Sequence, residues 1–309
     1  MKILVAEYAV AVGLGGTFQI EGKAMLSTLV SSFEKSFCDV VYPTAGPTIG
    51  AGDPIFIDGK RELEDLIGSI DVDYGLVIAP DDLLAHFTQV LEGNTINLGS
   101  SPEVAGLCAD KLECTKALAT GNVPVVEALL QPLPACGCDL YVIKPRFGCG
   151  SEGVQISSSP KVAEGYIATR YTDGLHLSIS LIAGESSVLP LTINRQLIRM
   201  DGESICYTGS QVPYRTPRAS EILNVAETSA RVLGLKGYAG IDMIVADRPR
   251  VVDVNARPTT SMIGIARVMR EELGDLILRA HFGNLPEKVT IEGVCTFTKD
   301  DLLRGHLVV

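Results

Sequence analysis

Short apolar runs alternate with longer amphipathic stretches through the first hundred residues. Such runs are typical of strands and such stretches of helices, in the order expected for strand-helix-strand units on a parallel sheet. The pattern predicts strands over residues 3–6, 40–42 and 74–79 and helices over 21–35, 61–67 and 81–91. The chain is therefore expected to begin with a small α/β domain.

The pattern changes after a Gly-Ser-Ser-Pro cluster at residues 99–102. A helix is predicted over 103–120, because Gly121 and Asn122 form a helix stop signal. From residue 140 onward short strands follow one another through tight turns, which favours an antiparallel sheet. The predicted strands cover 140–144, 154–156, 177–182, 188–196, 205–210 and a hairpin over 241–255, and the predicted helices cover 219–233 and 264–273. We expect domains at 1–100, 101–169 and 170–309.

The hairpin carries acids on one face. Pairing across its turn at 246–249 puts Asp242 opposite Asp253, and the two-residue period of a strand places Asn255 on the same face. The opposite, core-facing side is predicted to hold Ile241, Met243, Val245, Val252 and Val254. Opposed like charges repel unless a cation lies between them, and this ligand set suits Mg²⁺. An exposed face with solvated acids is the alternative.

A glycine-rich turn separates the strands predicted over 140–144 and 154–156, flanked by Lys144 and Arg146. Glycines let backbone N–H groups approach an anion closely, which favours a nucleotide triphosphate as ligand. The turn is not a Walker A loop, because no Gly-Lys-Ser/Thr follows it. A flexible hairpin loop is the alternative.

Composition narrows the classes of function. The 309 residues are 46% hydrophobic and 20% charged with a formal net charge of -11, which argues against a surface that attracts nucleic acid or an anionic membrane. No apolar stretch is long enough to span a bilayer, and no signal segment precedes the first strand, so a cytoplasmic protein is expected. The glycines at 13–16 lack the dinucleotide spacing, since Phe18 stands where a glycine is needed. This disfavours a nicotinamide-dependent oxidoreductase.

Cysteines and histidines offer little support for other chemistry. Cys136, Cys138 and Cys149 lack a fourth metal ligand at a sensible spacing, so buried thiols are the default expectation. The four histidines show no paired spacing that would support a metal centre or a hydrolase triad.

Several chemistry-bearing residues occur in the order seen in ATP-grasp ligases. They are Lys111, Lys144 before the glycine-rich turn, Asp242, Asp253, Asn255 and Arg257. From about residue 100 to 265 the chain resembles this superfamily. The resemblance implies an α/β (α+β) protein with the ATP-grasp fold: an N-terminal Rossmann-like pre-ATP-grasp domain, a small lid subdomain and a C-terminal antiparallel-sheet subdomain.

The resemblance also implies roles for individual residues. Lys111 and Lys144 would contact the nucleotide phosphates, and the lid over them would be formed by Gly148, Gly150 and Ser151. Magnesium would be held by Asp242, Asp253 and Asn255, with Asp253 bridging two ions and Mn²⁺ able to substitute.

Arg257 would neutralise the acyl phosphate or the substrate carboxylate, and a surface salt bridge is its alternative role. The related D-alanine ligases carry an arginine where this chain has Gly240, so either Arg257 does that work or the site is weaker. Those ligases bind adenine and ribose through glutamates, whereas the segment here includes Thr169, Arg170, Tyr171 and His176. His176 would contact ribose or be a satisfied histidine at a strand start.

A narrower resemblance is to the archaeal tyramine-L-glutamate ligases of methanofuran biosynthesis and their relatives. It rests on the segments 7–9, 21–26, 194–196 and 255–261. Tyr8 and Arg195 would orient an aromatic amine and a glutamate carboxylate, or else serve as packing and sheet-surface residues. Ala256 replaces the proline usual between Asn255 and Arg257, which loosens the turn without removing a ligand.

The expected function is therefore ATP-dependent ligation of a carboxylate to an amine through an acyl phosphate, with ADP released. ATP and Mg²⁺ are the expected cofactors, and an amino acid and an amine, with glutamate and tyramine favoured, are the expected partners. A homodimer is compatible with this expectation. The alternatives are another amino acid or peptide ligase of the superfamily, or a non-catalytic protein that senses ATP.

Overall fold

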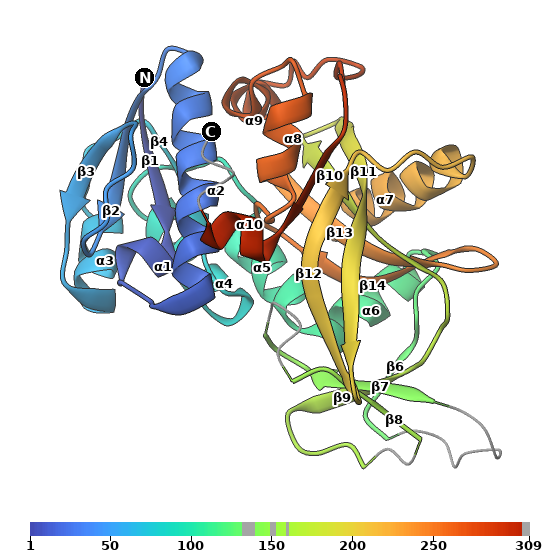
Figure 1. Ribbon diagram of the computed structural model, residues 1–309. Coiled ribbons are helices and arrows are strands. Elements are labelled where there is room, and N and C mark those ends of the chain that lie inside the picture. Colours follow the sequence, from blue (N-terminus) through green and yellow to red (C-terminus); the bar gives the residue numbers. More distant parts are fainter. Residues whose placement is uncertain (132–139, 149–152, 159–160, 305–309) are drawn as a thin grey trace.

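The computed structural model describes residues 1–131, 140–148, 153–158 and 161–304. Two sheets with their helices make up the fold, and Figure 1 shows the N-terminal sheet beside the long strands of the second. Within the described ranges, no helix has the length and apolar character required to cross a membrane.

The first sheet is parallel, as predicted, with the order β3-β2-β1-β4-β5. Its strands are β1 (Lys2–Glu7), β2 (Asp39–Thr44), β3 (Asp53–Phe56), β4 (Tyr74–Ile78) and β5 (Ile96–Asn97). The helices between them are α1 (Tyr8–Ala11), α2 (Gly16–Lys35), α3 (Gly59–Ile67) and α4 (Asp81–Glu92). β3 and β5 were not predicted, because a short edge strand with little burial carries almost no apolar pattern.

The second sheet has the order β14-β13-β10-β11-β12-β8-β7-β9-β6, and β15 pairs with β12. Its named pairings are antiparallel, as predicted. The strands are β6 (Ala128–Leu129), β7 (Tyr141–Pro145), β8 (Gln155–Ser157), β9 (Tyr166–Arg170), β10 (Leu175–Ala183), β11 (Val188–Asp201), β12 (Ser204–Val212), β13 (Gly237–Val245), β14 (Pro249–Asn255) and β15 (Cys295–Thr298). The sequence pattern missed β6, β9 and β15.

The single helix predicted over 103–120 is wrong: α5 (Pro102–Ala109) and α6 (Lys111–Thr120) replace it. Asp110 between them is extended, and its carboxylate accepts hydrogen bonds from two N–H groups in the first turn of α6. An aspartate that caps a helix in this way starts a new helix rather than continuing the old one. Lys111 therefore becomes the first residue of α6.

Helix α7 (Ala219–Leu233) has the predicted bounds, but the helix predicted over 264–273 is wrong. Two helices, α8 (Met262–Val268) and α9 (Leu273–His281), flank an extended segment. Met269 in that segment forms a bridge with Ile291 and has extended backbone angles, which interrupts the helical run. The last described helix is α10 (Lys299–Leu303).

Helix α2 joins the two sheets through one shared core. It packs against α8, α9 and α10 (Figure 1). Phe33 of α2 is fully buried, and a Cβ on Gly274 of α9 would lie 2.7 Å from the Phe33 backbone nitrogen, so only glycine allows this approach. The close packing holds the N-terminal domain against the second sheet.

The strands β7 and β9 have a much smaller core. Their cluster contains three buried residues, Tyr141, Ile143 and Ala168, with Val162 and Tyr166 packed against it. Little apolar area is therefore removed from water in this part of the sheet.

We expect the amide hydrogens of β7 and β9 to exchange faster than those of β10 and β13, because local opening there disrupts fewer buried contacts. Hydrogen exchange followed by mass spectrometry on the nucleotide-free protein measures this difference. Equal protection of the two strand pairs would show that the small cluster does not limit local stability.

Candidate active site

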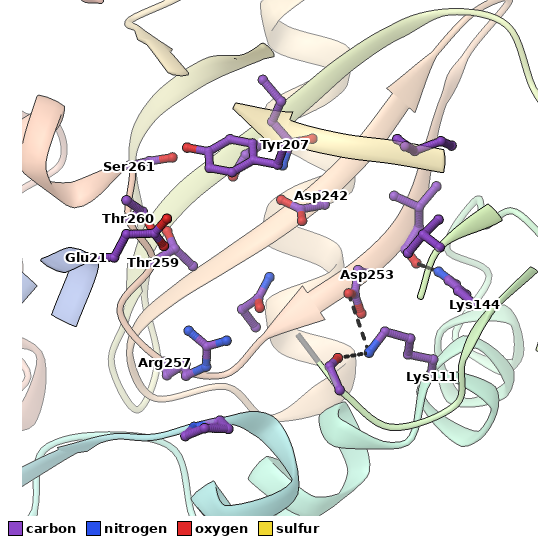
Figure 2. Close-up of a pocket in the computed structure, with 18 of the residues that line it drawn as sticks. Glu21, Lys111, Lys144, Tyr207, Asp242, Asp253, Arg257, Thr259, Thr260 and Ser261 are labelled. Carbon is purple, nitrogen blue, oxygen red and sulfur yellow. Dashed lines mark hydrogen bonds and ion pairs between the residues drawn. The ribbon is translucent and has the colours of Figure 1, made fainter. Parts of the chain in front are cut away.

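A cavity of about 300 Å³ lies where the two sheets meet. The predicted phosphate, metal and arginine residues that line it are Lys111, Lys144, Gly148, Asp242, Asp253, Asn255 and Arg257. In Figure 2, Asp242 lies between the two lysines on one side and Glu21, Thr260 and Ser261 on the other. Segments far apart in sequence thus meet around one space.

The predicted hairpin pairing is confirmed. Asp242 of β13 lies opposite Asp253 of β14, and Asn255 lies opposite Gly240. Both acids and Asn255 line the cavity. The core on the other side of the hairpin contains the buried residues Ile241, Met243, Val245 and Val254, as expected.

Val252 is the exception on this hairpin. A bulge between Asp242 and Met243 shifts the register, so that Met243 pairs with Val251. Val251 takes the core position and Val252 lines the cavity, which corrects the expectation that Val252 is buried in the core. A bulge leaves one residue outside the ladder, and here the Val252 carbonyl accepts a hydrogen bond from Lys144 Nζ at 2.8 Å.

The two acids repel each other, so positive charge nearby stabilises their ionised forms. Burial, with added repulsion from Asp253, raises the pKa of Asp242 to about 7, while hydrogen bonds from Ser178 and Gln196 oppose the shift. Burial also lowers the pKa of Lys144, against the attraction of Asp253. A cation bound between the carboxylates would favour ionised Asp242.

Lys111 lies close to the acidic pair. Its Nζ is 3.8 Å from Asp253 Oδ2 and donates a hydrogen bond to the Gly148 carbonyl at 2.5 Å. The start of α6 is anchored by Arg146, whose Nε and Nη2 donate to the two carboxylate oxygens of Asp110 at 2.8 and 2.6 Å. This bidentate pair connects the strand carrying Lys144 to the helix carrying Lys111.

The donors in the cavity fit a hard divalent cation. Among the described residues no three His, Cys, Asp or Glu side chains are grouped to hold a metal ion. Two carboxylates and the Asn255 amide oxygen are instead available, a set that Mg²⁺ completes with water and phosphate oxygens.

Arg257 follows β14 and is held by the N-terminal domain. Its Nε donates to Asp81 Oδ1 at 3.0 Å, and only 12% of the Arg257 side chain and 9% of the Asp81 side chain are exposed. Gly240 leaves no room for an arginine of its own, because a Cβ there would lie 2.6 Å from Thr259 Cγ2. Arg257, which follows the hairpin, instead brings a guanidinium to the cavity.

The expected nucleotide residues are only partly brought together. Arg170 and His176 line the cavity, as does Thr169, and burial lowers the pKa of His176. Tyr171 is not among the lining residues. Gly150 and Ser151 lie outside the described residues, as do the three cysteines considered for a metal site.

The two expected substrate residues do not line the cavity. Tyr8 packs beside Phe87, with ring centroids 5.7 Å apart. Arg195 is exposed, and its guanidinium lies over the Tyr214 ring, 5.9 Å from the centroid. Its neighbour Gln196 faces the cavity, since adjacent residues of a strand point to opposite faces.

Sequence reasoning assigned no role to four charged residues at this site: Glu7, Glu21, Asp81 and Lys299. Glu7 ends β1 and Asp81 follows β4, which is a signal, since the carboxyl ends of parallel strands commonly form sites. Burial raises the pKa of Glu7 to about 7, with opposing hydrogen bonds from Val10 and Ala9 and attraction from Arg257.

Comparison with known proteins agrees with this geometry. Residues 108–261 match an ATP-grasp domain. The chain belongs to the ATP-grasp superfamily, has its fold, and is an ATP-dependent ligase.

Two relatives carry the name tyramine--L-glutamate ligase. The protein from Methanocaldococcus fervens is 29% identical over 282 residues, covering 85% of this chain and 89% of the relative. The protein from Methanocaldococcus jannaschii is also 29% identical, covering 85% and 84%. A crystal structure of an ATP-grasp superfamily protein from Archaeoglobus fulgidus matches with a TM-score of 0.78 and 27% identity, covering 96% of this chain and 98% of that one.

Replacement of Asp81 tests how Arg257 is held. We expect Asp81→Asn to lower kcat by up to about 100-fold, because the guanidinium loses the charged partner that orients it. Steady-state ligase kinetics measure the effect, and Asp82→Asn, an exposed neighbour, serves as the matched control. A folded Asp81→Asn protein with unchanged kcat would contradict this role.

Glu7 makes the stability of the protein depend on pH. Its folded-state pKa of about 7 exceeds the ordinary glutamate value of 4.5, so its stabilising contribution is complete below about pH 4.5 and is lost as the pH rises through 7. Between pH 4.5 and 7 this group should lower the free energy of unfolding by on the order of 3 kcal/mol, at roughly 1.4 kcal/mol per pKa unit, and Glu7→Gln should remove that decrease. Urea unfolding from pH 4.5 to 8 measures the difference, with exposed Glu164→Gln as control. Parallel pH profiles for Glu7→Gln and the wild type would contradict the expectation.

Proposed function

We propose that the protein joins the carboxylate of glutamate to the amine of tyramine, with ATP converted to ADP and phosphate. The observation that carries the proposal is the opposed pair Asp242 and Asp253, flanked in one cavity by Lys111 and Lys144. The names of the two Methanocaldococcus relatives support this choice of acid and amine.

The reaction needs no nucleophile from the protein. The substrate carboxylate attacks the γ-phosphorus of ATP and forms an acyl phosphate as ADP leaves. The neutral amine then attacks the acyl carbon, a C–N bond forms, the C–O bond to phosphate breaks, and the amine loses a proton. Bound Mg²⁺ supplies charge neutralisation for the triphosphate and the phosphate that leaves.

Residues of this chain position the reacting groups and offset their charge. Lys111 and Lys144 would reach the phosphates, since both line the cavity and their side-chain nitrogens lie there beside backbone carbonyls and the Asp253 carboxylate. Asp242, Asp253 and Asn255 would hold one or two Mg²⁺ ions, for which Mn²⁺ would substitute. Arg257 faces the same space and stabilises the negative charge that develops on the acyl phosphate.

The apolar wall of the cavity supports an aromatic amine. Leu14 and Phe18, near the start of α2, line the cavity and are 37% and 43% exposed. Met25, further along α2, also lines it. An aromatic ring placed against this wall would remove exposed apolar area from water.

A coupled assay for ADP release tests the function. The protein is incubated with ATP and Mg²⁺ and a grid of acids and amines, and turnover is expected to require glutamate together with tyramine. Stimulation by a different pair would assign another amino acid or peptide ligase. Nucleotide binding without turnover for any pair would indicate an ATP sensor.

Asp253→Asn should abolish this turnover and leave the fold intact, because the amide removes a negative charge from the cation site. Circular dichroism checks the fold. Asp247→Asn, which alters the exposed turn of the same hairpin, should keep wild-type turnover. Wild-type rates for Asp253→Asn would refute the site.

A further inference from the structure

An ion pair at the end of the cavity away from Lys111 and Lys144 has no role in the steps described above. Lys299 Nζ lies 2.9 Å from Glu21 Oε1, and the two side chains are 27% and 16% exposed. Both residues line the cavity, and Figure 2 shows Glu21 on the opposite side of Asp242 from Lys111 and Lys144. The pair joins α2 to α10 across the site.

The Glu21 carboxylate has unused hydrogen-bonding capacity. Oε1 is buried and, apart from the ion pair, accepts no hydrogen bond from the described residues. From the part of the chain that the structure describes, Oε2 accepts only a long hydrogen bond, 3.4 Å, from Thr260 Oγ1. A buried carboxylate is normally satisfied by shorter hydrogen bonds, so this one is prepared for a further donor.

Lys299 is held in place by its surroundings. It is the first residue of α10, whose start is fixed by a capping box between Thr298 and Asp301. β15, immediately before it, pairs with β12. The Nζ lies 5.5 Å from the centroid of the Tyr207 ring, which forms the wall beside it.

Tyr207 connects this end of the cavity to the acidic hairpin. Burial raises the pKa of its hydroxyl, and the negative charges of Glu21 and Asp242 both add to the increase. The Tyr207 hydroxyl and Ser210 Oγ are hydrogen-bonded at 2.8 Å. One ring thus lies near both the ion pair and the metal-binding face.

We propose that Glu21 and Lys299 bind the head group of an α-amino acid substrate, Glu21 its ammonium and Lys299 its carboxylate. The inference rests on the proposed ligase function and specifies which part of the acid substrate is recognised. A head group held at this end leaves the second carboxylate of the substrate to face Asp242 and Asp253.

Charge balance favours a zwitterion over a simple amine. A zwitterion inserted between Glu21 and Lys299 replaces one ion pair by two and leaves every charge partnered. A ligand with a single ammonium would pair with Glu21 and leave Lys299 without its partner in a partly buried position, which is unfavourable. The same argument disfavours a simple carboxylate, which would strand Glu21.

Substrate analogues test the two contacts separately. Glutarate lacks the ammonium and 4-aminobutanoate lacks the α-carboxylate, so wild type should show at least a tenfold higher KM for each than for glutamate. Glu21→Gln should raise the KM for glutamate at least tenfold and leave the KM for glutarate nearly unchanged. Lys299→Met should raise the KM for glutamate at least tenfold and leave the KM for 4-aminobutanoate nearly unchanged. Exposed Glu287→Gln and Lys288→Met serve as matched controls.

The proposal would be overturned if variants that still ligate showed equal KM increases for glutamate and the analogues, or no increase at all. Either result would leave the ligase function standing. Loss of ADP release for every acid and amine in the wild type would instead refute the function itself. If a single variant does not fold, the exchanged protein Glu21→Lys with Lys299→Glu keeps an ion pair between α2 and α10. An unchanged KM for glutamate in that protein would show that the pair is structural, whereas a tenfold increase supports recognition.

Discussion

The repulsion between Asp242 and Asp253 is the constraint around which the rest of the site is arranged. The two carboxylates oppose each other on adjacent strands, and burial with this repulsion raises the pKa of Asp242 to about 7. Lys111 and Lys144 reach the same space from a helix and a strand outside the hairpin. Such a cluster is stable only when positive charge is close, so a charged ligand site follows from the arrangement itself.

The N-terminal domain completes this site rather than only supporting it. Asp81 binds Arg257, and Glu7 lies near enough for the same guanidinium to affect its pKa. α2 brings Glu21 to the cavity, and Gly22 beside it leaves room for the Glu7 carboxylate, which a Cβ at that position would approach to 2.3 Å. Packing between the two parts of the fold therefore positions side chains at the cavity as well as stabilising the protein.

Much of the fold could be predicted because it depends on local periodicity. Helix α7 has its predicted bounds, and the hairpin pairs Asp242 with Asp253 as expected. The errors arose where one residue changes a local pattern: Asp110 caps a second helix, Met269 joins a bridge, and a bulge moves Val252 to the cavity. Backbone hydrogen bonds decided these positions, and apolar spacing does not report them.

By itself, the sequence determined that Asp242 and Asp253 oppose each other and share a strand face with Asn255, because the two-residue period is a property of the backbone. Only the tertiary structure decided that Gln196 rather than Arg195 faces the cavity, and that Glu21 and Lys299 reach it. These positions depend on how α2 packs against α8 and α9 and on the pairing of β15 with β12. Contacts between residues so distant in the chain leave no periodic trace in the sequence.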